Sequence, residues 1–328
     1  MKICILGAGS LGSAIGAALA EAGSDVALVN RSATHVAAIS AWGLEVTDER
    51  GTRHVRVRAT TDVASVGTAD LVVVLVKSFD TRSAITRAAA PDGPIGAHTA
   101  VLSLQNGLGH EEILAEVVGH GRVLAGKTYA GGVMTGPGRV VSGVSGKATI
   151  IGELDGGISE RVRTIAAEFE RAGLAITISR NIGAAMWDKL FVNVATGGLS
   201  AITGLAYGDL YAVAEVKTTA LAAVTEAMAV ARAAGVQVEF THPEQAWNRA
   251  AEGLPFGFKA SMLQSLERGS ITEVDFIHGA VVRWGERVGV ATPVNAALVG
   301  CIKGIERALQ LRSARDRLGA EHDQHGLR

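Results

Sequence analysis

A run of glycines directly follows the first apolar segment of the chain, with the spacing of a phosphate-binding turn. The apolar segment covers residues 3–6, and the run after it consists of Gly7, Ala8, Gly9, Ser10, Leu11 and Gly12. In a GxGxxG turn between a strand and a helix, the first glycine permits the tight bend, the second lets the backbone approach a pyrophosphate, and the third lets the helix pack closely on the strand. We therefore predict that residues 7–12 bind a dinucleotide; the alternative is a glycine-rich turn without a ligand.

The end of the second predicted strand, at residues 25–29, indicates which dinucleotide is bound. Folds that prefer NAD(H) usually place an Asp or Glu at this end, on the adenosine ribose. This chain has Asn30, Arg31 and Ser32 there, with no carboxylate. Because a guanidinium matches the geometry of a phosphate, Arg31 is suited to the 2′-phosphate of NADP(H). We predict NADP(H) as the cofactor; the alternative for Arg31 is a solvated loop charge.

Polar residues also follow two further predicted strands. Lys77 comes directly after the apolar run 71–76, and Asn106 comes shortly after the run 101–104. In open α/β sheets, ligands bind outside the carboxyl ends of the strands, so these side chains fall at the same edge as the glycine turn. Taken alone, Lys77 could simply extend into solvent, and Asn106 with Gly107 could form an ordinary turn.

The second half of the chain offers a lysine and an asparagine on one face of a predicted helix. Lys189 and Asn193 are four residues apart, which places them on the same side of a helix. Their neighbours are apolar, so the helix is expected to be largely buried, and a lysine on it needs a reason. The structural alternative is an interfacial lysine that pairs with Asp188 or another carboxylate.

A possible helix start lies further along, at residues 270–273. The sequence Ser-Ile-Thr-Glu fits a capping box that ends at Glu273, and Asp275 would then be a first-turn charge. On the residues alone, capping explains Glu273 without any catalytic role.

The elements that must position these residues indicate an α/β fold with two domains. Residues 1–180 alternate apolar strands with helices, which predicts a Rossmann-type doubly wound sheet with some antiparallel additions. A hairpin is expected at 44–57. Further strands are expected at 123–128, 140–142, 148–151 and 174–178. From residue 181 the strand signals stop, and an all-helical domain is expected for 181–328, with helices at 184–199, 213–234, 243–250 and 271–288 and a polar, frayed tail from about 313.

Composition restricts the classes of partner, the compartment and the metal sites that we expect. A net charge of −1 over 328 residues gives no reason to expect nucleic acid or an anionic membrane as a partner. Two cysteines provide no disulfide framework, which favours the cytoplasm. No metal site is expected, because the nine histidines are scattered without ligand spacing. We expect surface or capping roles for His35, His54, His110 and His278.

Together these features resemble the ketopantoate reductase (2-dehydropantoate 2-reductase) family, from Met1 to about Arg307. The motifs that carry the resemblance are 7–12, Val76-Lys77, 105–109, 187–190 with Asn193, 261–264 and 272–275. The resemblance implies a Rossmann domain, a helical domain and an active site in the cleft between them. It also implies NADPH-dependent reduction of a 2-oxo acid in pantothenate biosynthesis, and it is compatible with a homodimer.

The resemblance also assigns roles to individual residues. It implies that Lys189 is the general acid, and an ammonium aimed at the developing alkoxide suits that role physically. It places Asn106 near nicotinamide and substrate, Asn193 on the substrate and Ser261 on its carboxylate. It places Lys77 and Glu273 on the cofactor, with Glu273 also helping to order the catalytic site.

The chain departs from the family pattern at three positions. Asparagines that grip a hydroxylated substrate are replaced by Gly197, Tyr207 and Phe258, although Thr196 or Ser200 could compensate. The leading expectation is reduction of 2-dehydropantoate. One alternative is a paralogous 2-oxo acid reductase, or 2-hydroxy acid dehydrogenase, for a more apolar substrate. Another is a non-enzymatic NADP(H) sensor, which the retained catalytic residues disfavour.

Overall fold

The computed structural model describes residues 1–325, with side chains described for 1–312. The chain divides into two compact units, Met1–Met186 and Trp187–Arg328. The first unit holds all the strands of the described residues, and the second is helical. The α/β class and the helical second half are as the sequence predicts.

An eight-stranded sheet forms the centre of the first unit. Its strand order is β12-β11-β8-β7-β6-β1-β2-β5, and every neighbouring pair is parallel except β11 with β8. The bounds in that order are Ile176–Ile178, Thr149–Glu153, Val123–Thr128, Ala100–Ser103, Leu71–Val74, Lys2–Leu6, Asp25–Val29 and Arg58–Thr60. The apolar runs of β1 and β6 are buried along nearly their whole length, as strands covered on both faces must be.

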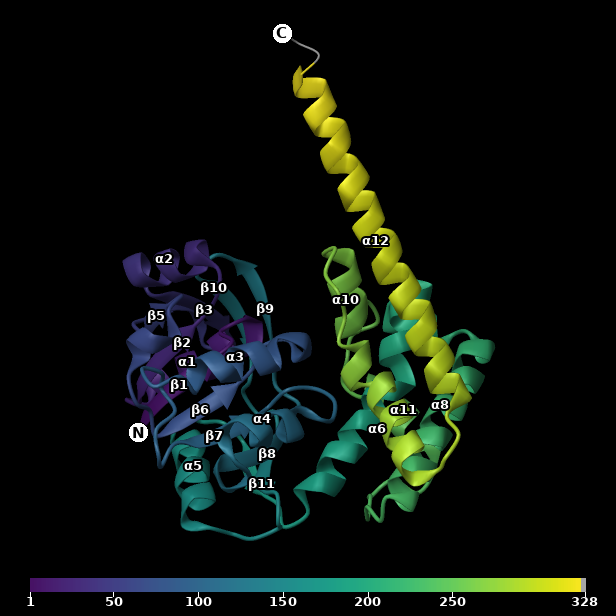
Figure 1. Cartoon of the computed structure of the whole chain (residues 1–328), viewed down its shortest axis with the longest axis horizontal. Coiled ribbons are helices and arrows are strands. Elements are labelled where there is room, and N and C mark those ends of the chain that lie inside the picture. Colours follow the sequence, from purple (N-terminus) through teal and green to yellow (C-terminus); the bar gives the residue numbers. More distant parts are fainter. Residues whose placement is uncertain (326–328) are drawn as a thin grey trace. The chain divides into compact units, whose positions relative to one another are not determined.

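Helices cover both faces of this sheet, as Figure 1 shows. On one face, Ile3 and Ile5 belong to a core that includes α1 (Ser10–Glu21) and α5 (Glu160–Arg171). On the other, Cys4 and Leu6 belong to a core that includes α3 (Thr81–Ala88) and α4 (His110–Val118). Alternate residues of one strand therefore contribute to two hydrophobic cores, one on each face of the sheet, as in a doubly wound sheet. Cys4 is fully buried in the second of these cores.

A smaller sheet, with strand order β4-β3-β10-β9, accompanies α2 (Ala33–Trp42). The predicted hairpin is confirmed as β3 (Leu44–Asp48) and β4 (Gly51–Val55). β10 covers Arg139–Gly143, whereas β9 (Gly131–Gly136) is not among the predicted strands. Its glycine-rich sequence has low strand propensity, and contacts distant in sequence support it instead: the N–H of Met134 donates to Ser10 Oγ at 3.1 Å.

The second unit is a set of packed helices. α6 (Ile182–Thr203) begins in the first unit and continues into the second. The other helices are α7 (Tyr207–Tyr211), α8 (Ala214–Ala233), α9 (Pro243–Ala251), α10 (Ser261–Glu267), α11 (His278–Val288) and α12 (Pro293–His325). α12, yellow in Figure 1, packs against α8 and α11. Where we expected a frayed tail from 313, α12 continues to His325, and 326–328 lie outside the described residues.

The capping-box interpretation of residues 270–273 is wrong. α11 begins only at His278, and a short 3₁₀ turn, Val274–Phe276, precedes it. The N-cap residue of this turn, Glu273, makes no side-chain capping bond, whereas the hydroxyl oxygen of Thr272 accepts from the N–H of Val274 at 3.2 Å. Both the N–H and the hydroxyl of Thr272 donate to Glu306 of α12 at 2.7 Å. This contact between residues distant in sequence outweighs the local capping-box pattern.

Surface roles for His35, His110 and His278 are also wrong, since all three side chains are buried. Each has a polar partner that satisfies part of its ring. His35 Nδ1 accepts from the N–H of Gly138 at 3.0 Å, His110 Nε2 lies 2.9 Å from Ser78 Oγ, and His278 Nδ1 lies 2.8 Å from Asn295 Oδ1. These partners lie 17 to 103 residues away in the sequence, so local patterns could not identify them.

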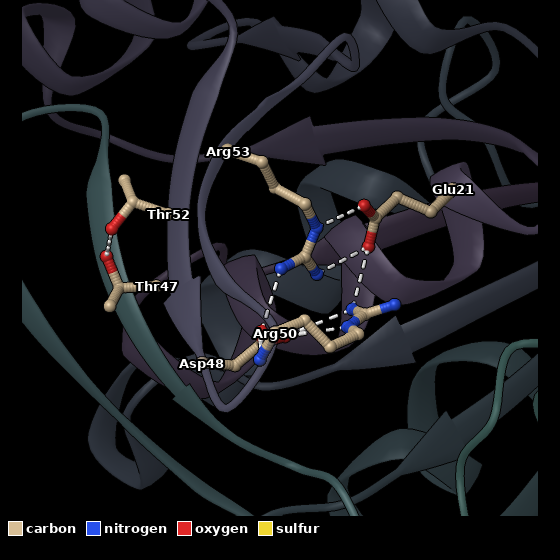
Figure 2. Close-up of polar contacts among 6 residues, drawn as sticks. All are labelled: Glu21, Thr47, Asp48, Arg50, Thr52 and Arg53. Carbon is tan, nitrogen blue, oxygen red and sulfur yellow. Dashed lines mark hydrogen bonds and ion pairs between the residues drawn. The ribbon is translucent and has the colours of Figure 1, made fainter.

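A cluster of four charged side chains ties the β3–β4 hairpin to the end of α1 (Figure 2). Arg53 donates to Glu21 Oε2 at 2.7 Å and to Asp48 Oδ1 at 2.9 Å, and Arg50 donates to Asp48 Oδ2 at 3.0 Å. Hydrogen bonds from Arg53 are the main cause that holds the pKa of Glu21 and of Asp48 below the usual range. On the other side of the hairpin, the Thr47 and Thr52 hydroxyls lie 2.9 Å apart.

Replacing Arg53 by Met is therefore expected to lower the free energy of unfolding by about 1–2 kcal/mol at neutral pH. Carboxylates whose pKa is depressed by folding stabilise the fold above their unfolded pKa, and that contribution is lost as the pH falls through their folded pKa. The difference between wild type and variant should thus shrink below about pH 4. Urea unfolding across pH measures this; Arg56→Met, at an exposed position after the hairpin, is the control. A difference that does not depend on pH would contradict the account.

Candidate active site

The backbone geometry of the glycine turn is compatible with a bound phosphate. Gly7 has φ +106° and lies so close to the backbone that follows β6 that a Cβ would stand 2.3 Å from the N of Val76. A Cβ on Gly12 would stand 2.4 Å from the carbonyl oxygen of Gly7. A Cβ on Gly9, in contrast, would meet nothing within 4 Å. Two glycines are thus needed for packing, and the third leaves open space in front of the backbone, where a pyrophosphate would lie.

The backbone groups of the turn divide into two sets. The N–H groups of Gly7 and Ala8 both donate to the carbonyl oxygen of Val29, at 3.1 and 2.9 Å, so they tie the turn to β2. Residues 10–12 form the first turn of α1, whose N–H groups have no acceptor within the helix, and this turn carries no acidic residue. The positive end of α1 is therefore suited to an anion.

The end of β2 presents a cation beside a helix start. Arg31 has a side chain that is 84% exposed and pairs with Asp80 at 2.9 Å. Ser32 caps α2 by accepting from the N–H of His35, and Asn30 Oδ1 accepts from the N–H of Ser32 at 2.8 Å. A pocket of about 330 Å³ opens beside this turn, lined by Asn30, Ser32 and His35 with residues 134–137. These residues fit the phosphorylated adenosine end of NADP(H).

Lys77 and Asn106 follow neighbouring parallel strands, and one glutamine connects their loops. Gln105 Nε2 donates to the carbonyl oxygen of Val76 at 2.9 Å and to Thr81 Oγ1 at 2.8 Å. The residues next to these anchors are Lys77, which is exposed, and Asn106, which is half-buried. The structure thus brings the glycine turn, Lys77 and Asn106 to the carboxyl ends of β1, β6 and β7, which are neighbours in the sheet.

A buried carboxyl, that of Glu111, lies in the first turn of α4, shortly after Asn106 in the chain. Burial raises the pKa of Glu111 to about 7, although hydrogen bonds from its own backbone N–H and from Ser103 act in the opposite direction. The sequence patterns did not single out this residue, because a glutamate in the first turn of a helix is normally an exposed charge.

Glu111→Gln is expected to leave stability unchanged near pH 4 and to raise it by about 2–3 kcal/mol near pH 8. A carboxyl whose pKa is raised by folding is tolerated in its protonated form, so the wild type loses stability as the pH rises from about 4.5 to 7. Glutamine carries no charge at any of these pH values. Chemical unfolding at both pH values measures the effect, with Glu160→Gln at an exposed first-turn position of α5 as the control. Equal stability of Glu111→Gln and wild type at pH 8 would rule out a charged, destabilising Glu111.

In the second unit, α6 carries the predicted lysine and asparagine one helical turn apart. Lys189 and Asn193 are both half-buried. Asn193 Nδ2 is buried and has no hydrogen-bond acceptor within the described part of the chain. A buried amide donor without an acceptor is costly in a protein, and a ligand oxygen would satisfy it. The carboxylate of the neighbouring Asp188 accepts from the backbone N–H groups of Glu239 and Phe240.

The three positions that depart from the family pattern have apolar surroundings. A Cβ on Gly197 would lie 3.1 Å from Cε of Met262, so the methionine methyl reaches the helix at that point. The rings of Tyr207 and Phe258 meet edge to face, with centroids 5.1 Å apart. The asparagines expected in the family are thus replaced by a thioether and two aromatic rings.

Both hydroxyls that could compensate for the missing asparagines already have a partner in the protein. Thr196 Oγ1 lies 2.8 Å from the Tyr207 hydroxyl, and Ser200 donates to the carbonyl oxygen of Leu205 at 2.8 Å. Both groups are buried and serve the packing of α6 against residues 205–207. These contacts explain both hydroxyls as structural groups of the second unit.

Ser261 and Glu273 lie on other elements of the second unit. Ser261 is exposed as the first residue of α10, and Glu273 is half-buried just before the 3₁₀ turn at 274–276. Among the described residues, no group of three or more His, Cys, Asp or Glu side chains is arranged to hold a metal ion. Within the same residues, no helix combines the length and apolarity needed to cross a bilayer.

Comparison with known protein families gives one consistent result. A family described as "Ketopantoate reductase PanE/ApbA" matches residues 3–156, and one described as "Ketopantoate reductase PanE/ApbA C terminal" matches residues 181–306. A 2-dehydropantoate 2-reductase of Halobacterium salinarum is 38% identical over 312 residues, which cover 94% of this chain and 99% of the relative.

Solved structures are also similar to this chain. A PanE/ApbA family ketopantoate reductase from Ralstonia eutropha has a TM-score of 0.86 at 35% identity, with 94% of this chain and all of that chain covered. A D-mandelate dehydrogenase bound to NADH and anilino(oxo)acetate has a TM-score of 0.87 at 26% identity over the same shares.

Proposed function

Because the chain belongs to the ketopantoate reductase family, we propose that it reduces 2-dehydropantoate to pantoate with NADPH. The chain is accordingly an NADP-dependent oxidoreductase that acts on a small 2-oxo acid. The observation in this structure that carries the proposal is the buried Nδ2 of Asn193, without an acceptor among the described residues and one helical turn from Lys189. A carbonyl or carboxylate oxygen of the substrate is the acceptor that this amide requires.

Each unit contributes a different part of the chemistry. In the first unit, residues 7–12 bind the pyrophosphate, Arg31 binds the 2′-phosphate, and Lys77 and Asn106 orient the cofactor. NADPH supplies the hydride when it is bound. Lys189 is the general acid of this proposal: its ammonium stabilises the negative charge that develops on the keto oxygen and then protonates it. Glu273 helps to order this arrangement.

The remaining contacts hold the substrate. Asn193 and Asn106 donate their amide N–H groups to its oxygens, and Ser261 binds its carboxylate. 2-Dehydropantoate carries two methyl groups on the carbon next to the ketone, so it presents an apolar side as well as polar ends. The buried Met262 and the half-buried Phe258 make the surroundings of α6 apolar, which suits these methyl groups.

A reductase for a more apolar 2-oxo acid is not favoured. The likeness to the D-mandelate dehydrogenase rests on 26% identity, whereas the relatives at 35% and 38% identity carry the ketopantoate name. A non-enzymatic sensor has no use for Lys189 and Asn193. We place the reaction in pantothenate biosynthesis in the cytoplasm, with a homodimer as the proposed assembly.

The absorbance of NADPH during turnover tests the proposal. The purified chain is mixed with NADPH and either 2-dehydropantoate or phenylglyoxylate, an aromatic 2-oxo acid, and each reaction is repeated with NADH. Turnover of 2-dehydropantoate with NADPH at the higher kcat/KM is expected. Faster turnover of phenylglyoxylate would assign the chain to the apolar alternative, and a preference for NADH would contradict the role of Arg31.

A further inference from the structure

Arg31 and Asp80 form a two-point ion pair that connects the loops after β2 and β6. Arg31 Nη1 donates to Asp80 Oδ1 at 3.1 Å, and Arg31 Nη2 lies 2.9 Å from Asp80 Oδ2. This is the fork-to-fork arrangement that guanidinium groups adopt with carboxylates and with phosphates alike. The same two nitrogens are therefore the donors that a phosphate would need.

The carboxylate of Asp80 does not cap α3, although Asp80 stands at the N-cap position of that helix. It occupies the N-cap position of α3, where an aspartate normally accepts from a backbone N–H of the first turn. The structure shows no such side-chain bond at this cap. The carboxylate is turned to Arg31 instead, and it is only 21% exposed whereas the arginine is 84% exposed.

We propose that Asp80 competes with the cofactor's 2′-phosphate for Arg31 and thereby limits how strongly the chain prefers NADPH over NADH. This inference rests on the proposed role of Arg31. If the guanidinium turns to the phosphate, it gives up two hydrogen bonds to Asp80. If it stays, the carboxylate remains beside a phosphate dianion and repels it. NADH has no 2′-phosphate, so neither cost applies to it.

Asp80→Asn isolates this effect, because asparagine has the same shape, keeps the capping ability and loses the charge. Dissociation constants for NADPH and NADH are measured by quenching of tryptophan fluorescence or by calorimetry, without substrate. We expect NADPH to bind about 3- to 10-fold more tightly than to wild type, and NADH to bind within about twofold of wild type. Because the repulsion is electrostatic, the gain should shrink at high salt.

Asp62→Asn is the matched control. Asp62 caps the 3₁₀ turn Val63–Val66, accepts from the N–H of Ala64 and lies near Arg87 rather than Arg31. This variant removes one carboxylate from the same unit, and it should change neither affinity. Asp80→Ser, which also retains a capping side chain, provides a second neutral variant if Asp80→Asn folds poorly.

The possible outcomes separate the inference from the function on which it rests. Weaker or unchanged NADPH binding by Asp80→Asn, or an equal gain for NADH, overturns the competition between Asp80 and the phosphate. Arg31→Ala tests the premise: it should weaken NADPH and leave NADH unchanged. If Arg31→Ala has no such effect, or wild type binds no NADPH, the cofactor assignment fails and the inference fails with it.

Discussion

Replacing Lys189 by Ala is expected to lower kcat for 2-dehydropantoate by about 10²- to 10⁴-fold, the usual contribution of a general acid. The keto oxygen gains negative charge as hydride arrives at its carbon, and in the variant only water remains to donate a proton to it. NADPH affinity should stay close to that of wild type, because the residues proposed to bind the cofactor's phosphates belong to the first unit. Steady-state kinetics and a binding titration measure the two quantities separately.

The control for this variant is Lys217→Ala, which removes a lysine from an exposed position on α8. It should retain the kcat of wild type. An undiminished kcat in Lys189→Ala would remove the proposed general acid. A parallel loss of NADPH affinity would indicate that Lys189 acts on the cofactor instead.

Gly9→Ala is expected to weaken NADPH binding by about 10- to 100-fold, the equivalent of 1–3 kcal/mol of steric conflict. Its methyl group would enter the open space in front of the turn, where we place the pyrophosphate. Because that methyl would meet no protein atom within 4 Å, the free energy of unfolding should change little. Binding titration and urea unfolding, measured on the same preparation, test both parts.

Gly7→Ala is the matched variant at the other glycine, and its effect should be on the fold. Its Cβ would overlap the backbone at Val76, and alanine strongly disfavours φ +106°. We expect a loss of stability of about 3 kcal/mol or more. A stability loss in Gly9→Ala as large as that in Gly7→Ala, or NADPH affinity unchanged in Gly9→Ala, would contradict the proposed phosphate site.

Long apolar runs and tight turns made much of the fold predictable. The continuous run that contains β6, the glycine turn and the β3–β4 hairpin all have strong local signals, and the structure has each of them. β9 escaped prediction because its glycine-rich sequence is held by contacts such as that of Met134 with Ser10. The capping box failed for a similar reason, since Glu306 on a distant helix organises Thr272.

In the candidate site, too, local patterns could be predicted from the sequence and long-range contacts could not. Lys189 and Asn193 could be paired from their spacing alone, and the strand ends pointed to Lys77 and Asn106. The partners of charged side chains, and the effect of burial on a pKa, could not be predicted because they depend on residues that are distant in sequence. Asp80 is 49 residues from Arg31, and the carboxyl of Glu111 owes its raised pKa to burial rather than to any motif.

The transfer of label from the cofactor tests the central claim most directly. The chain is incubated with 2-dehydropantoate and NADPH that carries deuterium at both hydrogens of nicotinamide C4, and the product is analysed by mass spectrometry. Reduction by this chain predicts pantoate with a single deuterium, bound to the carbon that was the ketone. Pantoate without deuterium, or no pantoate while NADPH stays bound, would contradict hydride transfer to this substrate.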